Sequence, residues 1–242
     1  MSELIAPPGG PAAMPATPPA EVLHLPIWPS GQSSQRLEGA QIAVTWFSDH
    51  ATYQQALTEA VLAAAHDSRF HDPKHLVMPS GCGRKVRNLP EWNVPAANLV
   101  HARALMFARQ SLSRQQVFAD DTWASIYGKG DYCMPHSHVR ADVSIVYMLE
   151  PGDPDPGDTF AGKLYFADPR IGWTCPVERG RVVRPFIPDM APGTMVLFAG
   201  EYLHGVHAYR GTQPRITMSW NLTLQQQPGN PREWAFRIAG EG

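Results

Sequence analysis

The chain has 242 residues, 43% of them hydrophobic and 17% charged, which is enough apolar material for one well-packed core. Its formal net charge of −2 lacks the basic excess that favours nucleic acid or an anionic membrane surface. No apolar run reaches the roughly 18 residues that a membrane-spanning helix needs. The composition therefore predicts a protein with neither a nucleic-acid partner nor a membrane partner.

The three cysteines, Cys82, Cys133 and Cys175, are odd in number and form no C-x-x-C pair. Such usage is typical of reduced thiols in an intracellular protein rather than of a disulfide framework. The first Lys or Arg is Arg36, so the beginning of the chain lacks the charged segment of a signal peptide. Together these features predict a cytoplasmic location.

The sequence divides at about residue 38. Residues 1–38 are rich in Pro, Ala and Gly, and we predict that they form an extended or disordered tail. Residues 39–242 are predicted to form a single domain. Its first element is the strand Q-I-A-V-T-W-F, after which Ser48 or Asp49 is placed to cap a helix.

Helical spacing and strand patterns then follow in turn. Residues 49–112 supply helical support, and residues 95–112 within them are predicted to be a helix with Pro95 in its first turn. Short strands separated by Gly, Pro and Asp clusters follow between residues 120 and 224. Many short strands of this kind predict a mainly β jelly roll with flanking helices.

The segment M-P-H-S-H-V places His136 and His138 two positions apart. In a strand the two side chains would share one face, with Cβ atoms about 6 to 7 Å apart, so both imidazoles could reach one metal ion. Two histidines on the surface or in the core would produce the same pattern. A metal site therefore needs a further ligand from elsewhere in the chain.

A third histidine lies in the second half of the strand region. His204 follows the strand T-M-V-L-F, and Arg215 comes eleven positions later within P-R-I-T-M-S-W-N. Arg215, Thr217 and Ser219 alternate with apolar residues, so one face of this strand is polar. An arginine that points into a largely apolar barrel is costly unless it meets an anion, and its planar fork suits a carboxylate. An edge strand whose arginine faces water is the alternative.

Read together, these segments resemble the iron(II)- and 2-oxoglutarate-dependent oxygenases, and most of all a group of bacterial and phage enzymes of that superfamily. The resemblance covers roughly residues 122–224 and rests on W-A-S-I-Y-G-K-G-D-Y, H-S-H, S-I-V-Y-M-L, G-K-L-Y-F-A-D-P-R, P-G-T-M-V-L-F, L-H-G-V-H and P-R-I-T-M-S-W-N-L. It implies a double-stranded β-helix, a cupin-like jelly roll, that uses Fe(II), 2-oxoglutarate and dioxygen. It assigns His136 and His204 as metal ligands and Arg215 to the far carboxylate of 2-oxoglutarate, with Thr217 beside it.

The sequence departs from the family's pattern at one ligand. The usual triad has an acid two residues after the first histidine, whereas this chain has His138 there. In the first interpretation His138 is itself the third ligand, which makes the site all-nitrogen. Asp142 is the alternative source of a carboxylate, provided that the chain turns between the two residues. A site with two histidines and a water is the third reading.

Further residues are expected near the co-substrate. Tyr127 and Tyr147 lie on predicted barrel strands and could hydrogen-bond 2-oxoglutarate or substrate, although buried tyrosines commonly serve packing. The resemblance implies hydroxylation of a small molecule or amino-acid-type substrate with decarboxylation of 2-oxoglutarate to succinate. A three-histidine cupin-like dioxygenase without 2-oxoglutarate and a non-catalytic jelly-roll binding protein are the alternatives. The size and class of the chain would suit a homodimer.

Overall fold

The computed structural model describes residues 22, 24–37, 41–71, 83–138, 140–168, 170 and 185–225. Most of the predicted tail therefore lies outside the described residues, as do Cys82 and Cys175. The described end of the tail packs on the body through Trp28, whose ring centroid is 5.7 Å from that of Phe47. It also contributes a short edge strand, because residues 34–36 pair with the strand that follows.

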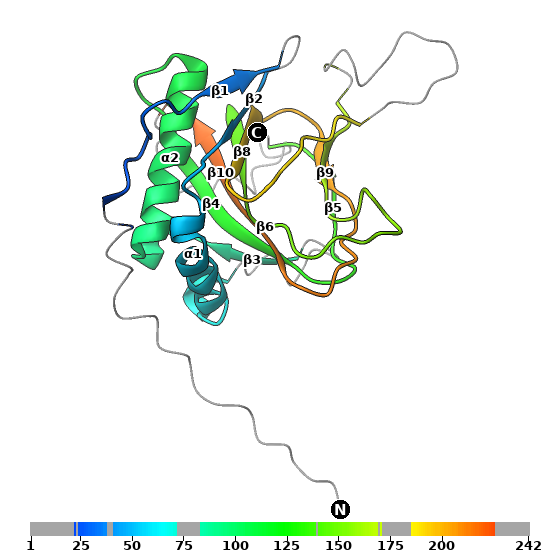
Figure 1. Ribbon diagram of the computed structural model, residues 1–242. Helices are drawn as coiled ribbons and strands as arrows, with labels where there is room; N and C mark the ends of the chain where they lie inside the picture. The colour runs from blue at the N-terminus through cyan, green and yellow to red at the C-terminus, as the bar shows by residue number, and fades with distance from the viewer. Residues whose placement is uncertain are drawn as a thin grey trace, which may run out of the picture.

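Two antiparallel sheets form the body of the described structure (Figure 1). The large sheet has the strand order β1-β2-β8-β6-β10-β4-β3, and the small sheet has the order β5-β9-β7. The strands of the large sheet, in that order, are Ser34–Arg36, Ile42–Trp46, Thr194–Ala199, Val143–Glu150, Arg215–Thr223, Phe118–Tyr127 and Arg84–Arg87. Those of the small sheet are Cys133–His136, His204–Val206 and Leu164–Phe166.

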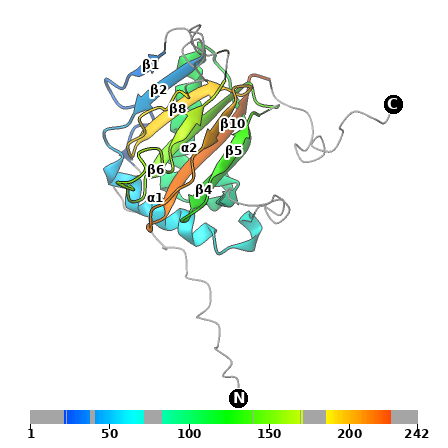
Figure 2. The same cartoon turned by 90° about the vertical axis from the view of Figure 1, so that its right-hand side faces the viewer.

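Helices cover one face of the large sheet, and the small sheet lies on the other side of it (Figures 1 and 2). Helix α1 spans Ala51–Ala64 and α2 spans Pro95–Leu112, the latter with the predicted bounds and with Pro95 in the first turn. Two 3-10 helices, η2 over Ser68–Phe70 and η4 over Leu89–Trp92, complete the helical layer. This arrangement confirms the predicted mainly β fold with flanking helices.

The two faces of β10 show how the sequence directs the sheet. Its apolar residues belong to the core between the sheet and the helices, namely Ile216, Met218, Trp220 and Leu222. The alternate residues face the space between the two sheets, where Arg215, Thr217 and Ser219 line a cavity. The predicted alternation therefore separates a hydrophobic core from a polar interior.

The predicted helix cap is wrong in its detail. Helix α1 begins after His50, which makes no side-chain cap hydrogen bond. The Asp49 carboxylate instead accepts two hydrogen bonds from the Arg103 guanidinium, at 2.8 and 2.6 Å. A bidentate, charge-assisted pair is stronger than a cap bond to a neutral N–H, and Arg103 is fully buried and needs that partner.

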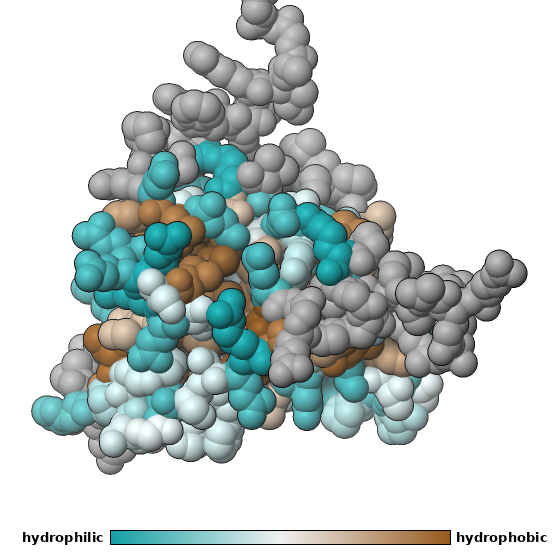
Figure 3. All heavy atoms as spheres, turned by 90° about the horizontal axis from the view of Figure 1, so that it is seen from above, coloured by the Kyte–Doolittle hydropathy of each residue, from teal (hydrophilic) through white to brown (hydrophobic). Residues whose placement is uncertain are grey.

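Neither described helix combines the length and the apolar character that crossing a bilayer requires. Seen from above, the described surface mixes polar and apolar side chains, with an apolar patch to the left of centre (Figure 3). Among the large apolar side chains, Trp46, Met134 and Phe160 are each more than half exposed. Isolated exposed apolar residues of this kind are ordinary for a folded protein.

Candidate metal centre

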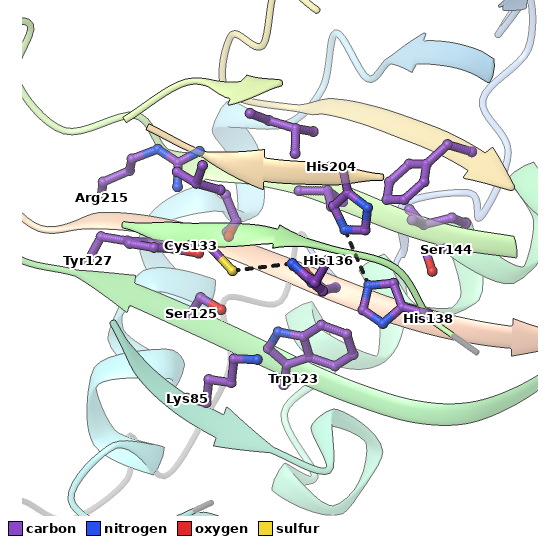
Figure 4. Close-up of a pocket in the computed structure, with 17 residues that line it drawn as sticks. Lys85, Trp123, Ser125, Tyr127, Cys133, His136, His138, Ser144, His204 and Arg215 are labelled. Atoms are coloured by element: carbon purple, nitrogen blue, oxygen red, sulfur yellow. Dashed lines mark hydrogen bonds between the residues drawn. The ribbon is translucent and has the colours of Figure 1, made fainter. Parts of the chain in front are cut away.

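Three histidines converge in the space between the two sheets (Figure 4). One ring nitrogen from each of His136, His138 and His204 lies within 4.8 Å of the others. The ring centroids are 4.4 Å apart for His136 and His204, and 5.0 Å apart for each of the other two pairs. No other group of this kind is found in the described part of the chain.

The small sheet and a tight turn bring these histidines together. His136, at the end of β5, pairs directly with His204, at the start of β9. The chain then leaves β5, and the backbone N–H of His138 donates to the carbonyl of Gly200 at 2.7 Å. A Cβ atom at Gly200 would lie 2.1 Å from the Ala141 carbonyl oxygen, so only glycine permits this approach. Local backbone geometry therefore places His138 beside the paired residues His136 and His204.

Hydrogen bonds on the far side of two rings direct their other nitrogens inward. His136 Nδ1 lies 2.8 Å from the Met134 carbonyl and His204 Nδ1 lies 2.8 Å from the Tyr202 carbonyl. A carbonyl can only accept, so each Nδ1 carries the hydrogen and each Nε2 keeps a lone pair. This is the arrangement that second-sphere groups impose on histidines that bind metal.

His138 is oriented by a side-chain amide instead of a carbonyl. Its Nδ1 lies 3.2 Å from the amide nitrogen Nδ2 of Asn221, and Asn221 Oδ1 accepts from the Ser144 hydroxyl at 2.9 Å. A 180° rotation of the amide exchanges its oxygen and its NH₂, and the Ser144 hydroxyl can accept as well as donate. After that rotation His138 Nδ1 would donate to the amide oxygen, and Nε2 would keep the lone pair that a metal needs.

The surroundings keep all three rings neutral. Burial lowers the pKa of His138 to about 2 and that of His204 to about 3, with further lowering by the charges of neighbouring histidines and Lys85. Burial is also the main cause that lowers the pKa of His136, which the Met134 carbonyl opposes. Neutral imidazole is the form that binds a metal, so the three side chains are ready as ligands near neutral pH.

The spacing fits a single ion. Two nitrogens bound at about 2.1 Å and at right angles to one another are about 3.0 Å apart. The Nε2 atoms of His138 and His204 are 3.3 Å apart. This separation allows both nitrogens to bind one ion, and imidazole ligands suit iron, zinc, copper or nickel.

Arg215 lies at the opposite end of the same cavity (Figure 4). Its side chain is 2% exposed, and neither Nη1 nor Nη2 has a hydrogen-bond partner among the described residues. Its guanidinium carbon lies 5.0 Å from the ring centre of Tyr127. Burial lowers the pKa of Arg215, but a guanidinium remains charged in proteins. An unsatisfied buried cation of this kind requires an anion to complete its surroundings.

The cavity that joins these two ends has a volume of about 500 Å³, including its open part. Thr217 and Tyr127, both predicted near the co-substrate, line it. Its wall also includes Trp123, Ser125 and Ser144, which were not predicted from the sequence as site residues. Trp123 and Ser125 alternate with Tyr127 along β4 and so share its face of the sheet. This alternation could have predicted that they line the cavity.

Two predicted residues lie elsewhere. Asp142 is exposed, and its carboxylate accepts from the backbone N–H of Leu224 at 2.7 Å, so the structure does not bring it to the histidines. Tyr147 is fully buried on the opposite face of β6, where its hydroxyl donates to Tyr53. Tyr147 thus belongs to the core under the helices and not to the wall of the cavity.

Comparison with known proteins gives one match at the level of sequence families. Residues 121–221 match the family model described as "Putative 2OG-Fe(II) oxygenase". The matched segment contains the three histidines and Arg215. No curated protein matches the chain.

Solved structures show the same fold. AviO1 from Streptomyces viridochromogenes Tue57 is 14% identical with a TM-score of 0.54, covering 79% of this chain and 92% of its own. EctD from S. alaskensis, crystallised with 2-oxoglutarate and 5-hydroxyectoine, is 18% identical with a TM-score of 0.54, covering 77% and 73%. The α-ketoglutarate-dependent epimerase SnoN from nogalamycin biosynthesis is 14% identical with a TM-score of 0.54, covering 78% and 86%. The double-stranded β-helix predicted from the sequence is thereby confirmed.

Proposed function

We propose that the protein is an Fe(II)- and 2-oxoglutarate-dependent oxygenase that hydroxylates a small molecule while converting 2-oxoglutarate to succinate. The match of residues 121–221 to the model of that family supports this proposal. Fe(II) and 2-oxoglutarate are the cofactor and the co-substrate of that family. In this proposal His136, His138 and His204 hold the iron. Arg215 binds the carboxylate of 2-oxoglutarate that lies farther from the metal.

The observation that carries the proposal is the unpartnered guanidinium of Arg215. Two buried N–H-bearing groups without an acceptor leave several hydrogen bonds unmade, and each costs about 1–3 kcal/mol. A carboxylate matches the planar fork with two parallel hydrogen bonds. The remaining carboxylate and keto group of a five-carbon diacid would then reach toward the histidines along the same cavity. A free acid with one carboxylate would satisfy only one end of this site.

The chain's own groups each have a defined task. When bound, Fe(II) with 2-oxoglutarate and dioxygen supplies the oxidising power, and the protein supplies orientation and exclusion of water. Thr217 lies next to Arg215 on the polar face of β10 and can donate its hydroxyl to the same carboxylate. Leu164, Phe198 and Val206 form the apolar part of the wall. A largely apolar wall keeps bulk water from the reacting centre.

His138 stands in the position where the family pattern has a carboxylate. We infer that it is the third ligand, since its Nε2 is 3.3 Å from that of His204 while Asp142 is held at Leu224. An all-histidine set leaves the iron one unit more positive than the usual triad does. That extra charge strengthens the binding of an anionic co-substrate.

The test is an anaerobic titration of the Fe(II)-loaded protein with 2-oxoglutarate. Chelation of the keto acid to Fe(II) produces a visible charge-transfer band, and succinate is then expected after admission of air. The Arg215→Ala variant should lose most of its affinity for 2-oxoglutarate, whereas Arg210→Ala serves as the matched control because Arg210 is exposed and pairs with Asp158. A wild-type protein that binds Fe(II) but shows neither band nor succinate would contradict the proposal.

A second candidate is a three-histidine dioxygenase that does not use 2-oxoglutarate, and the all-histidine ligand set favours it. The same titration separates the two, because only the first requires the keto acid. A binding protein without catalysis would consume no dioxygen under either condition. Product analysis distinguishes hydroxylation from epimerisation, which is the activity named for SnoN.

A further inference from the structure

We propose that Lys85 and Trp123 form a subsite for an anionic group on the molecule that is oxidised, so that the substrate is a small organic acid. This inference rests on the proposed function, because it assumes that Arg215 and the metal already serve 2-oxoglutarate. It adds the charge of the second substrate and the residues that recognise it.

Lys85 reaches the cavity from the edge of the large sheet. It lies on β3, where it pairs with Ser125 of β4, and its side chain extends over the neighbouring indole. Its Nζ atom is 5.2 Å from the ring centre of Trp123, and both side chains line the cavity (Figure 4). The indole ring centroid in turn lies 5.9 Å from the ring of His138. Lys85 therefore lies next to Trp123, and Trp123 lies next to His138.

The ammonium group has no acidic partner. Lys85 forms no salt bridge within the described residues, whereas Arg87 on the same strand pairs with Asp121. Among the described residues that line the cavity none is Asp or Glu. A cation that is held at the cavity without a counter-ion is a recognition group for an anion.

The charge balance indicates that this anion is not 2-oxoglutarate. Fe(II), Arg215 and Lys85 together carry four positive charges, the three ligands are neutral, and 2-oxoglutarate carries two negative charges. A net charge of +2 therefore remains when Arg215 is engaged by the distal carboxylate in the proposed mode. Lys85 is half-buried at the sheet edge, whereas Arg215 is 2% exposed at the closed end. The accessible cation is thus available to the second substrate.

The shape of the subsite limits the substrate further. The same cavity has to hold 2-oxoglutarate as well, so the second molecule is small. The face of Trp123 offers a flat apolar surface next to the ammonium group. A molecule with an apolar body and one anionic end would lie on the indole, with its anion at Lys85 and its carbon atoms toward the histidines. A lysine ammonium is a point charge, so both a carboxylate and a phosphate ester would satisfy it.

The experiment uses the full chain loaded anaerobically with Fe(II) and 2-oxoglutarate, and calorimetric titration with three probes. The probes are 3-phenylpropanoate, phenyl phosphate and the neutral 3-phenylpropanamide. Wild type should bind at least one anion about tenfold more tightly than the amide, since a charge-assisted contact of this kind contributes about that factor. Lys85→Met should remove the preference and Lys85→Arg should retain it. Lys129→Met, which removes an exposed charge outside the cavity, is the matched control.

Each outcome supports or overturns the proposed subsite. An anion preference that disappears in Lys85→Met, with an unchanged dissociation constant for 2-oxoglutarate, supports the subsite, and the stronger of the two anions identifies its chemistry. A wild type without preference, or a preference that survives in Lys85→Met, overturns it. Weakened 2-oxoglutarate binding in Lys85→Met also overturns it, because Lys85 would then serve the co-substrate. Absence of the visible band in wild type refutes the proposed function separately.

Discussion

Two buried arginines in this protein should respond in opposite ways to the same substitution. Arg103 and Arg215 are both almost fully buried, at 0% and 2% exposed. The Nη1 and Nη2 atoms of Arg103 donate to Asp49, to the Tyr53 hydroxyl and to the Pro26 carbonyl, and only its Nε lacks a partner among the described residues. Arg215 Nη1 and Nη2 have no partner within the described chain. We therefore expect Arg103→Met to destabilise the protein and Arg215→Met to stabilise the ligand-free protein.

The magnitudes follow from what each change removes. Breaking the Arg103 pair leaves the Asp49 carboxylate without its partner, which costs about 3–5 kcal/mol when such a pair is buried. Removing Arg215 relieves unsatisfied buried donors at about 1–3 kcal/mol each, against the loss of its cation–π contact with Tyr127 at about 0.5–2 kcal/mol. With two such groups, the net effect on the free energy of unfolding should be a gain of about 1–4 kcal/mol. In a protein of this size each kcal/mol raises Tm by about 2–4 °C.

The same Arg215→Met change should abolish stabilisation by 2-oxoglutarate. At a concentration one hundred times the dissociation constant, a ligand stabilises the folded state by about 2.7 kcal/mol, or about 5–10 °C in Tm. Differential scanning fluorimetry with Mn(II) or Ni(II) in place of Fe(II) measures both effects on one sample. A ligand-free Arg215→Met protein that is less stable than wild type by 2 kcal/mol or more would refute the reasoning, because Arg215 would then have a structural partner. A full thermal shift with 2-oxoglutarate in the variant would refute it equally.

Three further substitutions test the surroundings of the site. Asn221→Leu removes the amide beside His138 and should weaken metal affinity by about 10- to 100-fold in a Co(II) titration, whereas Asn221→Asp, which retains an acceptor, should not. Hydrogen bonds from the Thr212 and Gln213 backbone N–H groups and the Tyr209 hydroxyl hold the pKa of Asp153 well below its usual range. The stability from Asp153 is present above its unfolded pKa of about 4 and lost as pH falls through the folded value, so Asp153→Asn should flatten the fall of Tm between pH 5 and 2. Tyr147→Phe should leave 2-oxoglutarate binding unchanged and cost about 1 kcal/mol in urea unfolding, since its hydroxyl contacts only Tyr53 among the described residues.

The sequence predicted elements best where local signals agreed with tertiary packing. Helix α2 has the predicted bounds because Pro95 suits a first helical turn and the apolar spacing continues without interruption. Strand β10 was readable because its polar and apolar residues alternate, and only one face can meet the helices. The short strands β1, β3 and β9 were not predicted. Three- or four-residue strands such as R-K-V-R carry little hydrophobic pattern, and pairing with a neighbour rather than propensity makes them strands.

The misplacement of Tyr147 has a related physical cause. Both faces of β6 carry apolar residues and are mostly buried, so alternation shows that Tyr147 shares a face with Ile145 and Leu149 but not which face meets the helices. Asp142 was an alternative ligand because a turn between residues 138 and 142 could have redirected it. The turn exists, with Ala141 donating to the His138 carbonyl, yet it directs the Asp142 carboxylate to the end of β10. Spacing along the chain cannot specify the direction of a side chain after a turn.

The replacement of a carboxylate by His138 and the acid-free wall of the cavity act in the same direction. An ordinary triad would place a negative charge beside the metal, and that charge would oppose a second anion in a cavity of this size. Here the described lining of the cavity contributes Lys85, Arg215 and three neutral imidazoles. The two cations offset the repulsion between two anionic molecules that bind in the cavity together. Because Lys85 is only half-buried, salt should screen its contribution more than that of Arg215. In the proposed mode, the ligand change and the cation at the sheet edge are two parts of one electrostatic arrangement that selects an acid as the second substrate.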